Sequence, residues 1–285
     1  MNTESKVSER YAEGAKEVQP DLCCPVNYDD ALLEKLPREI IDKDYGCGDP
    51  SHYVMNGDTV LDLGSGGGKI CYMAAQLVGE QGQVIGVDMT DEMLALARKY
   101  QNEMAEKTGG NRVSFLKGLI QDLALDIEAR EQFLADNPQA SEAALACFEK
   151  KQKSQSPLIE DGIVDIVVSN CVLNLVSDQD RHHMITEIFR VLKPGGRVAI
   201  SDIVSDLEVP PHFKEDAQLW SGCISGAYQE SRFLEVFREA GFENVMIDKR
   251  DEEPWQVVEG IEFRSVTVVA DKPGGTGRRC CQAFD

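Results

Sequence analysis

Strands and helices alternate along most of this 285-residue chain, and that order predicts a doubly wound α/β fold. A glycine-rich turn at residues 64–68 joins a short apolar run directly to an amphipathic helical pattern. Residues 164–169 form an apolar run of the kind found at the buried centre of a parallel sheet. We also expect a helical insertion after the third strand and a small C-terminal α+β extension.

The predicted strands share short apolar runs that end at a turn or a polar residue. In chain order they are residues 60–63, 84–87, 112–116, 164–169 and 197–200, followed by late strands at 244–249 and 264–269. Apolar residues at helical spacing predict the helices between them, at residues 70–78, 93–97, 184–192 and 233–240. Thr90 and Asp91 supply an N-cap and a first turn for the second of these helices. The sequence KPGG at residues 193–196 predicts a sharp turn before the fifth strand.

Residues 122–160 differ from the rest of the chain in composition. Ala, Glu, Gln and Lys dominate there, Leu and Phe recur at helical spacing, and Asn137-Pro138 supplies a turn signal. We interpret this segment as a helical hairpin inserted between the third and fourth strands. It can be a solvated structural insertion or a lid over the site.

Composition excludes several classes of function. The chain has 29 basic and 50 acidic residues, and its net charge of −21 argues against nucleic acid or an anionic membrane as the main partner. No apolar run approaches the roughly 18 residues of a membrane-spanning helix. Because the N-terminus lacks the apolar core of a secretion signal, we expect a cytoplasmic protein.

Nine cysteines are the most informative part of the composition. Their number is odd and no CxxC pair occurs, so neither a disulfide scaffold nor a zinc knuckle is indicated. In a cytosolic chain, cysteines bind metals, carry redox chemistry or pack in the core. Here they are Cys23, Cys24, Cys47, Cys71, Cys147, Cys171, Cys223, Cys280 and Cys281.

The turn Gly64-Ser65-Gly66-Gly67-Gly68 lets the backbone approach a ligand at the start of a helix. Asp88 ends the next strand, where a carboxylate can accept both ribose hydroxyls of a nucleoside. The glycines alone leave two ligands open, a dinucleotide or S-adenosylmethionine. Asp62, just before the turn, favours S-adenosylmethionine, because a carboxylate attracts an amino-acid ammonium but repels a pyrophosphate.

The segments VLDLGSGGG, GVDMTDEML and VLKPGGRVAISD resemble the class I S-adenosylmethionine-dependent methyltransferases, which have a Rossmann-like sheet. The resemblance implies that the glycine turn holds the methionine end of the cofactor, Asp88 the ribose and Met89 the adenine. Gln121 stands where many relatives carry an acidic residue, so the adenine contact there involves Gln121 or the backbone of Ile120. The expected cofactor-binding residues are Asp62, Gly64, Ser65, Gly66, Gly68, Asp88, Met89, Ile120, Gln121 and Asn170.

Three cysteines are expected near that cofactor site. Cys171 follows the fourth strand directly, at the sheet edge where ligands bind in open α/β folds, so it should face the cofactor. Cys47, in the sequence YGCG, precedes the first strand, and Cys223, in WSGC, follows the fifth. Both segments can reach the same edge.

These segments resemble the arsenite methyltransferases more specifically. The matching sequences are YGCG, LDLGSGGGKICY, SNCVLNLV, RVLKPGG, SDI and LWSGCISGA, over residues 45–230. The resemblance implies three arsenic ligands, Cys47, Cys171 and Cys223, and a fourth, redox cysteine, which is Cys23 or Cys24 here. Thiolates suit trivalent arsenic, a soft centre whose lone pair can attack the sulfonium methyl without a general base.

The same resemblance implies a reductive step. Methyl transfer oxidises arsenic to the pentavalent state, and a disulfide formed between Cys47 and Cys23 or Cys24 would return two electrons. Thioredoxin or glutathione would then reduce that disulfide. We therefore expect arsenite as the substrate and one of these thiols as the reductant.

The implied organisation has four parts. A polar helical segment (1–45) precedes the S-adenosylmethionine-binding methyltransferase domain (46–204), which contains the 122–160 insertion. A C-terminal extension (205–271) completes the substrate site, and a flexible tail (272–285) follows.

Two other functions stay open. Because the insertion is long for an arsenite methyltransferase, one alternative is a methyltransferase that acts on a small thiol, selenium or another metalloid. A non-catalytic, thiol-rich sensor of arsenite or cofactor is the second alternative. Among the remaining cysteines, Cys71 is expected in the core and Cys147 to be inert. Cys280-Cys281 is either an exposed tail or an arsenite-capturing dithiol.

Overall fold

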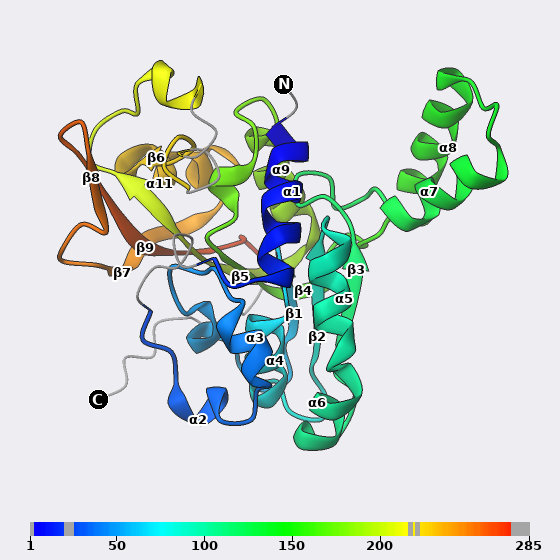
Figure 1. The fold of residues 1–285 in the computed structure, drawn as a ribbon, viewed down its shortest axis with the longest axis horizontal. Helices are drawn as coiled ribbons and strands as arrows, with labels where there is room; N and C mark the ends of the chain where they lie inside the picture. Colours follow the sequence, from blue (N-terminus) through cyan, green and yellow to red (C-terminus); the bar gives the residue numbers. More distant parts are fainter. Residues whose placement is uncertain (1–2, 20–25, 216–218, 220–222, 275–285) are drawn as a thin grey trace.

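A computed structural model describes residues 3–19, 26–215, 219 and 223–274 of the chain. Its strands form one nine-stranded mixed sheet, in which seven strands follow the order β3-β2-β1-β4-β5-β9-β7 (Figure 1). The short strands β6 and β8 pair with β5 and β9. The strands are β1 (Thr59–Leu63), β2 (Gln83–Asp88), β3 (Val113–Lys117), β4 (Val164–Asn170), β5 (Leu192–Ser205), β6 (Tyr228–Gln229), β7 (Glu243–Arg250), β8 (Gln256–Val258) and β9 (Ile261–Asp271).

The first five strands are parallel to their neighbours, and the strand order reverses between β1 and β4. β9 pairs antiparallel with β5 and β7 pairs antiparallel with β9, so the C-terminal segment extends the same sheet. This topology confirms the predicted doubly wound fold. It also places the usual ligand-binding position of such sheets at the carboxyl ends of β1 and β4.

Helices cover both faces of the sheet (Figure 1). The α-helices are α1 (Thr3–Lys16), α2 (Asp30–Leu33), α3 (Arg38–Asp42), α4 (Lys69–Leu77), α5 (Asp91–Lys99), α6 (Gln101–Thr108), α7 (Ile127–Asp136), α8 (Glu142–Gln155), α9 (Arg181–Val191) and α11 (Glu230–Glu239). Single 3-10 turns are η2 (Pro50–Tyr53), η3 (Leu173–Leu175) and η4 (Pro211–Glu215). The described part of the N-terminal 45 residues is helical in three places, as the sequence predicts.

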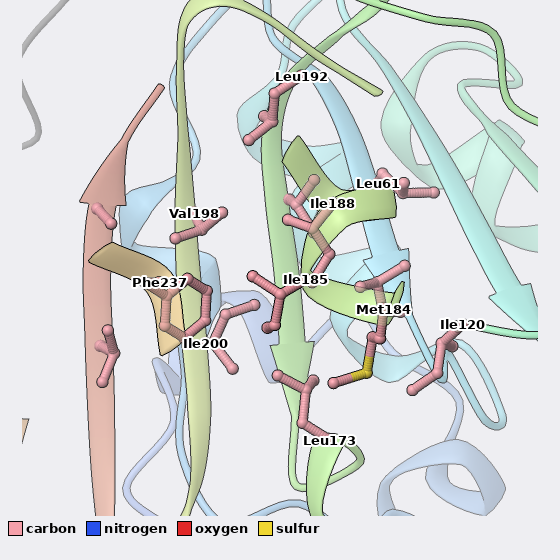
Figure 2. Packing of buried hydrophobic residues seen from close by; sticks show 14 of the residues in the cluster. Leu61, Ile120, Leu173, Met184, Ile185, Ile188, Leu192, Val198, Ile200 and Phe237 are labelled. Carbon is pink, nitrogen blue, oxygen red and sulfur yellow. The ribbon is translucent and has the colours of Figure 1, made fainter. Parts of the chain in front are cut away.

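The two faces of the sheet pack against different helices, which explains why its central strands β1 and β4 are mostly apolar. On one face, Met184 and Ile188 of α9 point toward the strands and share a cluster with Leu61 (Figure 2). On the opposite face, Tyr72 of α4 lies in a second cluster with Val60, the neighbour of Leu61 in β1. Burying one such side chain contributes about 1.5–3 kcal/mol, so both layers stabilise the sheet that positions the site.

Helices α7 and α8 form the predicted hairpin, with its turn between Asp136 and Glu142. Phe133 stacks on Phe148 with ring centroids 4.4 Å apart, so the two helices pack mainly on each other. Figure 1 shows the hairpin standing away from the sheet, at the right of the view. Among the described residues of the hairpin helices, Gln152 alone is buried, and none of them lines the cavity described below.

The sharp turn predicted at residues 193–196 is wrong in one respect. The structure includes this segment in β5 as an irregular bulge, because Val164 pairs with Leu192 and Ile166 pairs with Arg197. Two backbone hydrogen bonds hold the bulge in place. Gly195 N donates to Lys272 O at 3.0 Å, and Lys272 N donates to Gly196 O at 2.8 Å. The fifth strand, predicted at residues 197–200, spans Leu192–Ser205 in the structure. The other predicted strands agree with the structure to within about three residues at their ends. Among the described residues, no helix has the length and apolar character needed to cross a membrane.

Candidate active site

A cavity of about 960 Å³, including its solvent-open part, lies at the carboxyl ends of β1, β2 and β4. The loops after these three strands line it, and Val7 and Tyr11 of the N-terminal helix α1 contribute a further wall. This is the edge of the sheet at which the strand order reverses, where doubly wound folds bind their ligands.

The glycine turn after β1 forms one wall of the cavity. Its backbone is left-handed at three glycines, a conformation that residues with a side chain rarely adopt. The φ angles are 67° at Gly64, 50° at Gly66 and 87° at Gly68. A Cβ on Gly64 would lie 2.4 Å from Val172 Cγ1, so this glycine also permits close approach of the loop after β4. Gly68 does not line the cavity. It is the N-cap of α4, and a Cβ there would lie 2.8 Å from Phe115 Cζ, so close packing requires glycine at this position.

Two carboxylates face the cavity, the buried Asp62 and the half-buried Asp88. Asp88 Oδ2 accepts a hydrogen bond from Gly66 N at 2.9 Å, and its Oδ1 accepts one from Thr90 N at 2.8 Å. Burial still raises the pKa of Asp88. Asp62 accepts a hydrogen bond from Cys71 Sγ at 3.2 Å, and burial raises its pKa to about 7. A cation bound beside Asp62 would therefore stabilise the ionised form of this carboxylate.

Most of the predicted cofactor residues meet around this cavity. With the exception of Gly68, they all line it: Asp62, Gly64, Ser65, Gly66, Asp88, Met89, Ile120, Gln121 and Asn170. They come from four separate stretches of sequence that the sheet edge brings together. Their assignment to parts of a cofactor stays a prediction.

The three predicted arsenic-ligand cysteines are all buried in one cluster at this edge. Cys171 Sγ lies 3.5 Å from Cys223 Sγ. Ligand atoms of Cys47, Cys171 and Asp202 lie within 4.8 Å of one another. Cys171 lines the cavity, whereas Cys47 and Cys223 do not, so Cys171 connects the cluster to the space where a cofactor could bind.

Asn170 and Ser265 hold the YGCG segment that contains Cys47. Asn170 Oδ1 accepts hydrogen bonds from Cys47 N at 2.9 Å and Gly48 N at 3.0 Å, and Ser265 Oγ donates to Cys47 O at 2.5 Å. A Cβ on Gly46 would lie 2.0 Å from Asn170 Nδ2. The glycines therefore let this segment pack tightly against the end of β4, next to Cys171.

Cys171 and Cys223 both adopt left-handed backbone conformations, with φ of 63° and 61°. For a residue with a side chain, this conformation costs roughly 1–2 kcal/mol. Cys171 N donates to Ser201 O at 2.8 Å, and Cys223 Sγ donates to Cys171 O at 3.3 Å. Such strained residues are concentrated at functional sites, where the surrounding contacts maintain them.

The structure adds two residues that sequence reasoning missed. Asp202 is fully buried beside Cys47 and Cys171, and burial raises its pKa to about 6. Asp202 belongs to the sequence SDI, one of the segments that resemble the arsenite methyltransferases, and this could have identified it from the sequence. Tyr11 lines the cavity, and its pKa is raised by burial and by the thiols of Cys223 and Cys171. No motif marks it, because the fold of α1 alone brings it there.

The remaining cysteines separate clearly. Cys71 is buried, as predicted, and its thiol donates to Asp62. Cys147 is exposed on α8. The predicted redox pair Cys23-Cys24 and the tail pair Cys280-Cys281 lie outside the described residues.

Comparison with known proteins agrees with this geometry. The methyltransferase domain family matches residues 55–241. An arsenite methyltransferase of Aquipseudomonas alcaligenes is 34% identical over 237 residues, covering 82% of this chain and 59% of that protein. One from Halobacterium salinarum is 38% identical over 209 residues, covering 73% of this chain and 43% of that protein.

A solved structure gives the same result. The fold is similar to that of an arsenic(III) S-adenosylmethionine methyltransferase from Chlamydomonas reinhardtii, with a TM-score of 0.68 and 29% identity. The match covers 88% of this chain and 76% of that chain.

The chain therefore belongs to the methyltransferase domain family, and it has the Rossmann-like sheet of the class I S-adenosylmethionine-dependent methyltransferases. The two curated relatives described above are arsenite methyltransferases, which confirms the resemblance seen in the motifs of this chain. The chain spans 59% and 43% of the lengths of the two curated relatives described above.

Proposed function

We propose that this chain transfers a methyl group from S-adenosylmethionine to trivalent arsenic held by Cys47, Cys171 and Cys223. The observation that carries the proposal is the burial of these three thiols in one cluster, with Cys171 on the wall of the cofactor cavity. The arsenite methyltransferases among its relatives support the same substrate.

The cavity fits the proposed cofactor. Asp62 offers a carboxylate to an ammonium group, and Asp88 offers one to ribose hydroxyls. Ser65 Oγ is buried and has no hydrogen-bond partner among the described residues, and it lies on the cavity wall. The bound cofactor supplies an electrophilic sulfonium methyl group.

The thiols perform the substrate chemistry. Arsenite, As(OH)₃, exchanges its three hydroxyls for three sulfurs, and each thiol proton leaves with one hydroxyl as water. Soft sulfur donors match this soft centre. The arsenic then carries a lone pair opposite its three sulfurs, and that lone pair is the nucleophile. The protein contributes chiefly by positioning, which can be worth about 7–11 kcal/mol in well-oriented reactions.

Reduction completes the proposed cycle. Methyl transfer forms an As–C bond, breaks the bond between the methyl group and the sulfonium sulfur, and releases S-adenosylhomocysteine. Arsenic becomes pentavalent, and two thiolates must give up two electrons to restore the trivalent state. Cys47 with Cys23 or Cys24 would form the resulting disulfide, and thioredoxin or glutathione would reduce it. The cysteine of this pair that reaches Cys47 would be its disulfide partner.

The alternative acceptors have less support. The length of the insertion was the reason to consider another small thiol or metalloid, yet neither helix of the hairpin lines the cavity. We therefore infer that α7 and α8 do not select the methyl acceptor.

The direct test is arsenic speciation after incubation of the purified chain with arsenite, S-adenosylmethionine and a thiol reductant. We expect methylated arsenic, and at least about a 100-fold loss of rate in Cys171→Ser, because removal of one ligand leaves the arsenic mispositioned. Cys147→Ser, on the exposed face of α8, is the matched control and should retain full activity. S-adenosylhomocysteine formed from another acceptor, without any arsenic product, would contradict the proposal. Binding of arsenite without turnover would instead indicate a sensor.

A further inference from the structure

Two loops carry the sulfur pair of the cysteine cluster. The Cys171 loop (residues 171–176) follows β4, and the Cys223 loop (residues 223–227) precedes β6. Their sulfurs are 3.5 Å apart, and both cysteines have left-handed backbone conformations. Conformations of this kind persist only where surrounding contacts determine them. The contacts that hold these two loops together therefore set the spacing of the sulfurs.

The closest approach of the loops is at Gly226. A Cβ on this residue would lie 1.9 Å from Asn174 O and 2.7 Å from Arg181 Nη2. Gly226 is not among the glycines with positive φ. Glycine is thus required at this position by the proximity of the Cys171 loop, and any larger residue would separate the two loops.

Arg181, the first residue of α9, connects both loops through their carbonyl groups. Its Nη2 donates to Gly226 O at 2.7 Å and to Asn174 O at 3.2 Å, while its Nε donates to Val176 O at 3.0 Å. The side chain is buried, and the guanidinium lies 4.6 Å from the centre of the Tyr228 ring. Only a planar, multiply donating cation can satisfy these acceptors in their different directions.

Asn174 attaches the same loop to β5. Its Nδ2 donates to Ile203 O at 2.6 Å and to Asp202 Oδ1 at 2.8 Å. The backbone N–H of Asn174 donates to Asp202 Oδ2 at 3.2 Å. Neither Asn174 nor Arg181 lines the cofactor cavity, so both act on the sulfurs without touching the cofactor position.

We propose that Arg181 is a positioning residue that fixes the Cys171 and Cys223 sulfurs at the separation needed to bridge one arsenic atom. This role deepens the proposed function and rests on it for the identity of the substrate. Loss of Arg181 lets the loops move apart, which weakens arsenic binding and leaves the cofactor cavity intact.

Phenylarsine oxide tests the sulfur pair without methyl transfer. Two thiols bind this trivalent arsenical, as two As–S bonds form and the two thiol protons leave with the oxide oxygen as water. The background variant carries serine at Cys23, Cys24, Cys280 and Cys281, which removes the adjacent thiol pairs in the sequence. In this background, equilibrium affinities for phenylarsine oxide and for S-adenosylmethionine are measured separately.

Arg181→Gln and Gly226→Ala should each weaken phenylarsine oxide binding at least about tenfold, because positional errors near 1 Å have effects of this size. Affinity for S-adenosylmethionine should stay within about twofold in both. Arg181→Lys, which keeps the charge and one donor direction, should lose less than Arg181→Gln. Arg190→Gln is the matched control, since Arg190 lies on the same helix but donates to Ile159 O and Asp161, away from the cysteines.

Two results would overturn the proposal. One is unchanged phenylarsine oxide affinity in Arg181→Gln. The other is a parallel loss of both affinities, which would show a merely structural role. If the parent chain fails to methylate arsenite while the dependence on Arg181 holds, the proposed function fails and the positioning role stands.

Discussion

Asp62 and Asp88 show how two carboxylates of one cavity acquire different properties. Backbone N–H groups of Gly66 and Thr90 donate to Asp88 and offset part of the effect of burial on its pKa. Asp62 accepts a hydrogen bond from the thiol of Cys71, a weaker donor, and burial raises its pKa to about 7. Asp62 is therefore the carboxylate whose charge depends most on a bound cation.

Cofactor binding should depend on pH through Asp62. Its folded-state pKa of about 7 lies above the ordinary value of 3.8, so the carboxyl is increasingly protonated below pH 7 and then cannot pair with an ammonium. We expect the dissociation constant of S-adenosylmethionine to rise about tenfold from pH 8 to pH 6, measured by calorimetry. Asp62→Asn should bind more weakly at pH 8 and lose this pH dependence. An equally steep profile in Asp62→Asn would assign the effect to another group.

The effect of Asp62 on folding stability has the opposite pH dependence to its effect on cofactor binding. Because the pKa of Asp62 is raised on folding, the native state holds its proton more tightly between about pH 4 and pH 7. The contribution of Asp62 to stability is therefore greatest below pH 4 and is lost as pH rises through 7. Function and stability thus conflict at this position until the cofactor binds.

At the scale of elements, the connections after the strands carry the site and the helical hairpin does not. The β1–α4 turn, the end of β2 and the β4 loop all contribute to the cavity wall. The α7–α8 hairpin instead stacks Phe133 on Phe148 and stands away from the sheet (Figure 1). Lys117 and Arg98 form ion pairs with it through Glu131 and Glu128. Such partly exposed pairs contribute little, about 0–1 kcal/mol each.

Replacing residues 127–155 by a short Gly-Ser linker should therefore leave the chemistry intact. We expect cofactor affinity and arsenic methylation rates within about twofold of the parent, with at most a small decrease in the melting temperature. The measurements are calorimetric binding, product speciation and thermal unfolding of the shortened chain. A loss of activity with unchanged cofactor affinity and stability would instead establish the hairpin as a lid over the substrate.

At the scale of the whole molecule, the predictable part of the site follows from strand order. Cys171 and Asp88 could be placed from the sequence because they end strands of a parallel sheet, whose carboxyl ends share one edge. Tyr11 could not, because α1 has no motif and its docking beside the cavity is a long-range contact. The position of Arg181 could not be predicted either, because the first residue of an amphipathic helix ordinarily faces solvent. Lys193 to Gly196 looked like a turn because a bulged strand uses the same residues.

One buried ion pair connects distant parts of the sheet. Arg197 of β5 donates to Oδ2 of Asp58, the residue just before β1, at 2.5 Å. It also donates to Tyr53 O at 2.8 Å. Both charged side chains are buried. Because removal of one partner leaves a buried charge unpaired, Arg197→Ala should lower the free energy of unfolding by about 3–5 kcal/mol in urea titrations.

The matched control for this pair is exposed. Arg250 pairs with Glu230 at 2.8 Å near the surface, and Arg250→Ala should change stability by less than about 1 kcal/mol. Equal effects of Arg197→Ala and Arg250→Ala would contradict the assigned importance of burial.

X-ray absorption at the arsenic edge can show whether Cys47, Cys171 and Cys223 together bind one arsenic atom. The serine background at Cys23, Cys24, Cys280 and Cys281 is loaded with one equivalent of arsenite, and the sulfur neighbours of arsenic are counted. We expect three sulfurs in this background, and two sulfurs with one oxygen in each of Cys47→Ser, Cys171→Ser and Cys223→Ser. Three sulfurs that persist in any one of these variants would contradict the ligand set.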